Sequence, residues 1–121
     1  MSTPNPRIMY LLLRRDLLTE LKWPLGALIT QAAHAATAVL WENRTDDDVL
    51  KYMEELDTMR KVTLQVDSKE ALESLAEKLR AAGVAHKLWV EQPENIPVCI
   101  AVKPMEKSNV HPHLKHLKLF A

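Results

Sequence analysis

The chain has 121 residues, enough for one domain, and its 47% of apolar and 26% of charged residues are typical of a globular protein. Sixteen basic and sixteen acidic side chains give a formal net charge of zero, which excludes nucleic-acid binding through bulk charge but leaves a local basic patch open. Two glycines exclude a phosphate-binding loop, and no apolar run is long enough to span a bilayer. We therefore expect one cytoplasmic domain over 1–121, without a membrane segment.

The first predicted element is a strand at 8–13, whose continuous apolar run indicates a central strand covered on both faces. Residues 14–16 form its polar exit, and 16–22 are expected to be a loop into the next helix. In open α/β sheets, ligands bind where the carboxyl ends of strands meet the starts of helices. Four basic side chains are therefore expected to converge near the start of that helix: Arg14, Arg15, Lys22 and Lys61.

A helix is predicted from Pro24 to Trp41, because proline suits the first helical position and the alanine-rich segment that follows favours a helix with a narrow wall. Gln31 and His34 are three residues apart, so they share one face of this helix. A lone histidine on such a helix is more often structural than catalytic. Periodicity alone leaves both interpretations of His34 open.

The later elements alternate between helices and strands. In chain order they are a helix ending near residue 57, a strand at 62–66, a helix at 68–82, strands at 86–90 and 98–102, and a basic final helix after Pro104. The short polar loop between the last two strands predicts that they are antiparallel. This order predicts a three-layer α/β/α domain with a four-stranded mixed sheet, three strands being parallel and the last one antiparallel.

The C-terminal segment contains three histidines, at positions 111, 113 and 116, which suggest a metal site. Pro112 separates two of them, and no acidic or cysteine side chain stands nearby to complete a ligand set. A helix packed by its leucines is the plainer interpretation, so we expect no metal and no cofactor. The single cysteine, Cys99, lies in an apolar run and is expected to be a buried structural thiol.

Several of these segments together resemble a known family. Residues 26–36, Gly-Ala-Leu-Ile-Thr-Gln-Ala-Ala-His-Ala-Ala, are similar to the signature helix of the type 2 peptidyl-tRNA hydrolases, in which a Gly-Lys pair leads into Ala-Gln and His-Ala. The resemblance continues through 61–64, 68–82 and 116–119, so it covers almost the whole chain. Residues 88–96 look most like its divergent subgroup, named peptidyl-tRNA hydrolase domain-containing protein.

The resemblance implies that the protein hydrolyses the ester between a peptide and the 3′ end of tRNA without a metal, and that tRNA is its partner. By position, His34 matches the family histidine, and Glu91 matches the acidic residue after the third strand. The implied catalytic residues are therefore His34 and Glu91. The implied substrate-binding residues are Gln31, Lys61, Arg15, Gly26 and Asn95. Ala27 stands where the family has a lysine.

Ester hydrolysis needs a base that activates water and a group that stabilises the developing oxyanion. Since a carboxylate fixes the tautomer of an imidazole, we expect His34 and Glu91 to lie within direct or water-mediated hydrogen-bonding distance. Lys61 or Arg15 could supply the positive charge that is missing at Ala27. Two alternatives stay open: a catalytically lapsed member that binds tRNA or a translation partner, and a protein-interaction scaffold.

Overall fold

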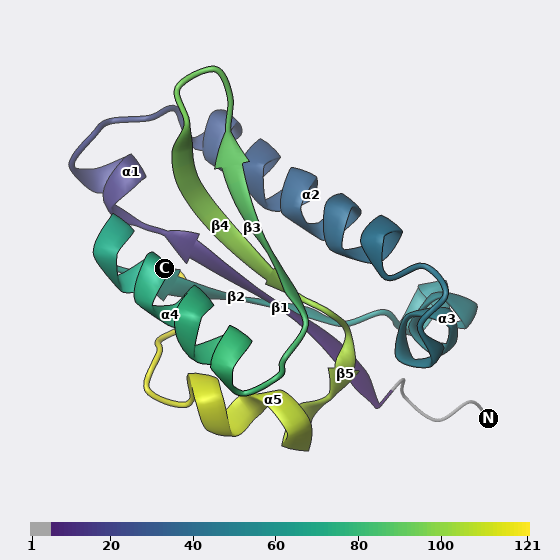
Figure 1. Cartoon of the computed structure of the whole chain (residues 1–121). Coiled ribbons are helices and arrows are strands. Elements are labelled where there is room, and N and C mark those ends of the chain that lie inside the picture. Colours follow the sequence, from purple (N-terminus) through teal and green to yellow (C-terminus); the bar gives the residue numbers. More distant parts are fainter. Residues whose placement is uncertain (1–5) are drawn as a thin grey trace.

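The computed structural model describes residues 6–121, and a mixed β-sheet forms its centre (Figure 1). The two central strands are β1 (Arg7–Arg14) and β4 (Ile96–Val102), and the outer strands are β2 (Lys61–Val66) and β3 (His86–Glu91), in the order β2-β1-β4-β3. β1 pairs in parallel with β2, whereas β4 is antiparallel to both of its neighbours. Strands β1, β2 and β3 therefore point the same way, and β4 runs against them.

The sheet confirms a mixed α/β fold, but the expected strand count was wrong. A fifth, two-residue strand, β5 (Met105–Glu106), pairs antiparallel with Arg7 and Ile8 at the start of β1. Two residues after a proline are too short to show a strand period, so no pattern in the sequence indicates β5. Among the described strands, β1 and β2 are the direct parallel neighbours.

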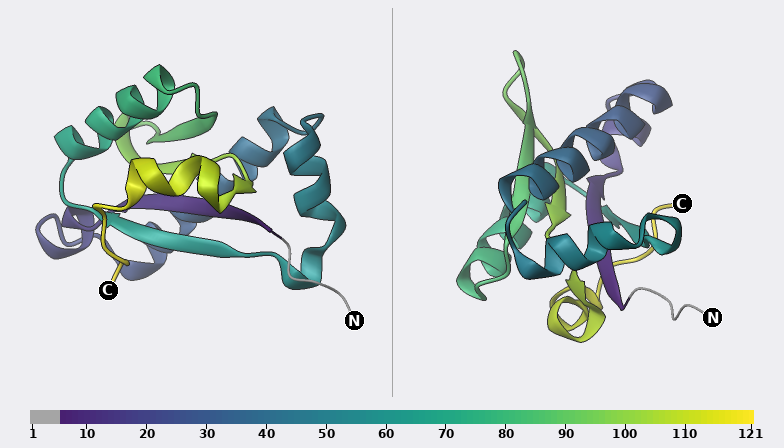
Figure 2. Two further views of the ribbon diagram at one scale, coloured as in Figure 1. Left: turned by 90° about the horizontal axis from the view of Figure 1, so that it is seen from below. Right: turned by 90° about the vertical axis from the view of Figure 1, so that its right-hand side faces the viewer.

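Helices cover both faces of the sheet (Figures 1 and 2). α2 (Leu25–Glu42) packs on one face together with the short α1 (Asp16–Thr19), while α4 (Lys69–Ala81) and α5 (Lys107–Leu114) pack on the other. α3 (Asp47–Glu54) follows α2, and its Tyr52 enters the same core as α2. None of the helices within residues 6–121 is both long and apolar enough to cross a membrane.

β1 supplies side chains to two separate cores. Met9, Leu11 and Leu13 pack under α2, whereas Ile8, Tyr10 and Leu12 alternate with them and pack under α4 and α5. Because successive side chains of a strand point to opposite faces, a strand buried on both sides is apolar without interruption. The prediction of a central strand covered on both faces is confirmed.

Side-chain caps set the starts of two helices. Asp46 accepts hydrogen bonds from the backbone N–H groups of Asp48 and Val49 at the start of α3, and Ser68 accepts one from Ala71 at the start of α4. α4 therefore begins where the sequence predicts, and Gly83 follows it with a φ of +72°. The helix expected to reach residue 57 is α3, which ends at Glu54, before a 3-10 turn, η1 (Leu56–Thr58).

Two segments differ from their expected structure. The segment 16–22, expected to be a loop, contains α1. The C-terminal helix ends at Leu114, and the chain then lies along the free edge of β2, where Lys118 accepts a hydrogen bond from Gln65 and Phe120 donates one to Thr63. An unpaired strand edge presents free backbone N–H and C=O groups, which the C-terminal segment satisfies here.

Candidate functional site

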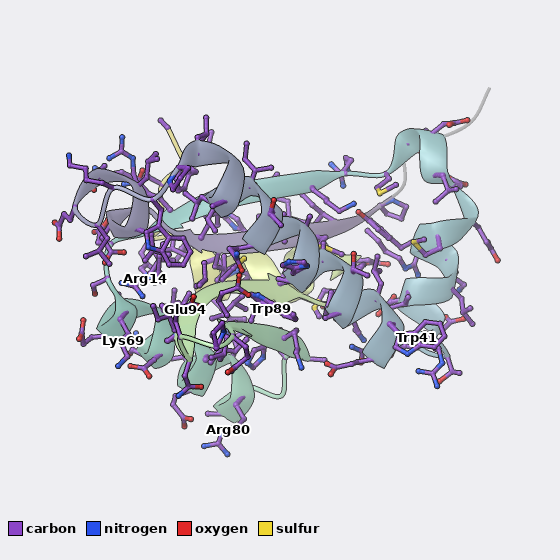
Figure 3. The ribbon with its side chains drawn as sticks, turned by 90° about the horizontal axis from the view of Figure 1, so that it is seen from above. Arg14, Trp41, Lys69, Arg80, Trp89 and Glu94 are labelled. Atoms are coloured by element: carbon purple, nitrogen blue, oxygen red, sulfur yellow. The ribbon has the colours of Figure 1, made fainter. Side chains whose placement is uncertain are left out.

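The candidate site lies between the first half of α2 and the end of β3 (Figure 3). Gln31 and His34 occupy one face of α2, as their spacing predicts. Trp89 and Glu91 are two residues apart on β3, so their side chains project from the same face of the sheet, toward α2. Four side chains from two distant segments thus meet in one cluster, which we name the α2–β3 cluster: Gln31, His34, Trp89 and Glu91.

Gln31 is the centre of the hydrogen bonding in the α2–β3 cluster. The indole Nε1–H of Trp89 donates to Gln31 Oε1 over 2.9 Å, and Gln31 Nε2 donates to Glu91 Oε2 over 2.8 Å. Only 4% of Gln31 is exposed. Since both ends of its amide are bound inside the protein, Gln31 links Trp89 to Glu91. Trp89 was not among the expected site residues, although its alternation with Glu91 on β3 was a usable signal.

His34 contacts this cluster through its ring. The imidazole stacks on the indole of Trp89 with 4.9 Å between ring centroids and an interplanar angle of 30°, and the residue is exposed to solvent. Within residues 6–121, no direct hydrogen bond joins His34 to Glu91. The direct form of the expected pair is therefore absent, and the carboxylate of Glu91 instead accepts a hydrogen bond from Gln31 through Oε2.

Arg14 is buried, with 5% of its surface exposed, and its guanidinium is bound within the protein. Its Nε and Nη2 donate to the two carboxylate oxygens of Asp16 over 3.0 and 2.7 Å, and its Nη1 donates to the carbonyl of Pro97 over 2.9 Å. Because Nε, Nη1 and Nη2 are all bound within the protein, this guanidinium is not available as a binding group for a ligand. Arg14 therefore stabilises the end of β1 and does not join a surface patch.

Lys61 lies far from the start of α2, so the expected convergence of four basic residues was wrong. The register pairs Met9 with Lys61 and Arg14 with Val66, five positions further along β1, or about 16 Å at 3.3 Å per residue. Because β2 is parallel to β1, its first residue lies at the opposite end of the sheet from the carboxyl ends of the strands. Lys61 Nζ instead lies 3.3 Å from the hydroxyl of Tyr52, and burial lowers the pKa of Lys61.

The other expected substrate-binding residues lie around the start of α2 and the β3–β4 loop. Arg15 Nε donates to the carbonyl of Ala121 over 2.6 Å. Gly26 is exposed in the first turn of α2, with open space around the position of a Cβ. Asn95 is exposed in the loop, with a φ of +58°, and accepts a side-chain hydrogen bond from Gln92. Within residues 6–121, none of these three is hydrogen-bonded or ion-paired to the α2–β3 cluster.

Ala27 is half-buried one turn before Gln31 on the same face of α2. Ala27, which stands where the type 2 peptidyl-tRNA hydrolases have a lysine, is therefore adjacent to the cluster. Among residues 6–121, no lysine or arginine is hydrogen-bonded or ion-paired to Gln31, His34 or Glu91. The α2–β3 cluster thus combines one imidazole and one carboxylate without a bound basic side chain.

The remaining reactive side chains lie outside the cluster. Burial raises the pKa of Cys99 to about 12, so its thiol stays protonated and unreactive, and the prediction of a buried thiol is confirmed. The three C-terminal histidines are exposed, on α5 or just after it. Across the described residues, no three His, Cys, Asp or Glu side chains come close enough together to hold a metal ion.

Comparison with known proteins assigns the chain to a family. The sequence model of the family described as Peptidyl-tRNA hydrolase PTH2 matches residues 7–120, and the chain belongs to this family. It is 45% identical over 120 residues to a human protein named "Putative peptidyl-tRNA hydrolase PTRHD1", a match that covers 98% of this chain and 86% of the human one. A mouse protein of the same name is 45% identical over 118 residues, covering 97% and 84% of the two chains. The resemblance to the divergent subgroup is confirmed.

Proposed function

We propose that the protein hydrolyses the ester between a peptide and the 3′ end of tRNA, in the cytoplasm, with His34 as the general base. The observation that supports this most is the α2–β3 cluster itself. An exposed imidazole stacks on Trp89, and a carboxylate is bound next to that same indole, in a chain that belongs to a peptidyl-tRNA hydrolase family. The family implies the substrate, and the cluster offers a base that solvent and substrate can reach.

In the proposed reaction, His34 takes a proton from a water molecule, whose oxygen attacks the carbonyl carbon of the ester. The bond between that carbon and the ribose oxygen then breaks, and the imidazolium returns its proton to the ribose oxygen. The products are a peptide with a free carboxyl group and a tRNA with a free hydroxyl group. The negative charge of Glu91 stabilises the imidazolium that forms between the two steps. No metal takes part in this scheme.

A second candidate function is tRNA binding without hydrolysis, and one observation favours it. Ala27 occupies the position of the family lysine. In the described part of the chain, no lysine or arginine side chain is bound to the α2–β3 cluster in its place. Removing one oxyanion-stabilising group typically costs about a hundredfold to a thousandfold in rate. A protein with this site could retain the substrate and lose most of the reaction.

A single-turnover assay on N-blocked aminoacyl-tRNA, run beside a binding measurement with the same tRNA, separates the candidates. Hydrolysis that His34→Asn abolishes supports the proposed function. Binding without hydrolysis favours the second candidate. If neither is detected, the protein-interaction scaffold remains as the better account. His113→Asn, on the exposed surface of α5, is the matched control.

A further inference from the structure

We propose that Trp89 is the positioning residue of this site, because it holds the Glu91 carboxylate through Gln31 and supports the His34 ring through its own. The kinetic part of this inference rests on the proposed function. The structural part does not, since it concerns the geometry of four side chains. Nothing in the family match or in the names of the relatives assigns a role to this tryptophan.

The direction of the Gln31 amide follows from its two hydrogen-bond partners. An indole N–H can only donate a hydrogen bond, and an ionised carboxylate can only accept. The Trp89 donor therefore fixes which end of the amide is oxygen, and the other end must present its NH₂ to Glu91. Without this donor, the carboxylate of Glu91 alone would select the orientation of the amide, and Gln31 Oε1 would lose its hydrogen bond.

The ring of Trp89 also contacts His34. The same indole whose N–H binds Gln31 forms the surface on which His34 stacks at 4.9 Å. The imidazole of His34 thus packs on the side chain of Trp89, which is itself held by its hydrogen bond to Gln31. His34 is exposed and stacks on Trp89, so the indole is the contact that restricts its ring.

The backbone that carries these side chains is regular at Trp89 and irregular just beyond it. Trp89 pairs with Cys99, which is fully buried in β4, so its backbone belongs to the regular part of the sheet. The register then shifts between Trp89 and Val90, and Glu91 pairs with Ile96 at the end of the hairpin. Glu91 therefore lies beyond an irregularity, next to an exposed loop. The pairing with Ile96 holds its backbone, whereas the position of its carboxylate depends on the side-chain bond to Gln31, and through it on Trp89.

The test compares two substitutions of Trp89 with a matched control. Trp89→Phe keeps an aromatic ring under His34 and removes the N–H donor, whereas Trp89→Leu removes both. Trp41→Phe makes the same change at a tryptophan that is 66% exposed near the end of α2. The first readout is the ¹⁵N–¹H spectrum of the Gln31 side-chain amide and of the His34 ring. The second is the single-turnover rate on N-blocked aminoacyl-tRNA.

We expect Trp89→Phe to shift the Gln31 amide resonances, and Trp89→Leu to shift the His34 ring resonances as well. In the reverse direction, Glu91→Gln should shift the indole N–H resonance of Trp89 through Gln31. The rate should fall about tenfold to a hundredfold in Trp89→Phe, since a small misplacement of a reacting group can cost about a hundredfold. The affinity for tRNA and the melting temperature should stay close to those of Trp41→Phe.

The inference is overturned if Trp89→Phe leaves the Gln31 amide resonances unchanged, or if its rate equals that of Trp41→Phe in a protein that hydrolyses the substrate. If the unmodified protein shows no hydrolysis, the proposed function fails by itself. The spectra then decide the positioning role alone. Gln31→Met supplies a second variant of similar size, and it should shift the Trp89 indole resonance without removing either ring.

Discussion

The amide of Gln31 on α2 donates a 2.8 Å hydrogen bond to the carboxylate of Glu91 at the end of β3, sixty positions further along the chain. This bond places the carboxylate beside Trp89, the residue on which His34 stacks. Because no direct hydrogen bond joins the two among residues 6–121, we propose that Glu91 acts on His34 through its charge and through their shared neighbours. The expected effects of substitutions at His34 and Glu91 depend on that arrangement.

We expect His34→Asn to lower the single-turnover rate by about a hundredfold or more, because general-base catalysis contributes effects of this size. His34 is exposed, so the change should leave tRNA affinity and melting temperature near those of the unmodified protein. The rate is measured on N-blocked aminoacyl-tRNA, and thermal unfolding is followed by circular dichroism. A lower melting temperature with an unchanged rate would instead identify His34 as a structural residue.

Glu91→Gln removes the charge of the carboxylate while keeping a group that can accept a hydrogen bond from Gln31. We expect a slower hydrolysis rate, because the imidazolium of His34 loses its nearby negative charge. Combined with His34→Asn, the substitution should add little further loss, since residues that act as a unit are not additive. Losses that multiply in the double variant would show that the two residues act independently.

Local patterns in the sequence predicted most of the fold. The apolar run of β1 indicated a strand buried on both faces, and Ser68 with Gly83 bounded α4, because strand alternation and helix caps depend on neighbouring residues. The pairing of Gln31 with Trp89 could not be read in this way. The two residues are 58 positions apart, and their contact depends on how α2 is placed over β3 in the folded protein.

Lys61 shows a different limit of sequence analysis. The pattern predicted a strand at 62–66, and β2 begins one residue earlier, at Lys61, but the place of Lys61 in the molecule follows from the direction of that strand. Parallel pairing of β2 with β1 puts Lys61 beside Met9 and away from Arg14. Lys61 therefore matches the family lysine by its position in the sequence, but it does not lie in the proposed site.

Ala27→Lys should raise the hydrolysis rate if the absent family lysine limits the reaction. Ala27 lies one turn before Gln31 on the same face of α2, so an ammonium group there can reach the region next to His34 and stabilise the developing oxyanion. The variant is compared with Ala33→Lys, at an exposed position on another face of α2. Equal rates in the two variants would show that the site does not use a charge at position 27.

Arg15 and Lys61 should differ in their effect on tRNA binding. Arg15 follows β1 at the end of the sheet where α2 begins, whereas Lys61, the first residue of β2, lies at the opposite end. We expect Arg15→Gln to weaken tRNA binding and to reduce the slope of log affinity against log salt by about one unit or less, as for one lost phosphate contact. Lys61→Gln should leave that slope unchanged. Equal effects, or binding that does not depend on salt, would remove the predicted role of Arg15.

The pH dependence of folding stability should depend on Asp46, which caps α3 and forms a 3.0 Å ion pair with Lys103. Partial burial acts to raise the pKa of Asp46, but the hydrogen bond and charge of Lys103 and the N–H groups of Asp48 and Val49 together lower it. A carboxyl group whose pKa is lower in the folded state contributes stability above its unfolded pKa of about 4. That contribution is lost as the pH falls through the lower, folded pKa.

Asp46→Asn keeps an efficient helix cap and removes the charge, so it isolates the ionic contribution. We expect the free energy of unfolding at pH 7 to fall by about 1 kcal/mol, because the ion pair is only partly buried. Urea unfolding at pH 7 and at pH 3 should show the difference between the two proteins shrinking at the lower pH. Asp47→Asn is the matched control, since the side chain of Asp47 is 77% exposed and pairs with Lys51 at the surface. A difference for Asp46→Asn that is the same at both pH values would mean that the stability lost belongs to the cap and not to the charge.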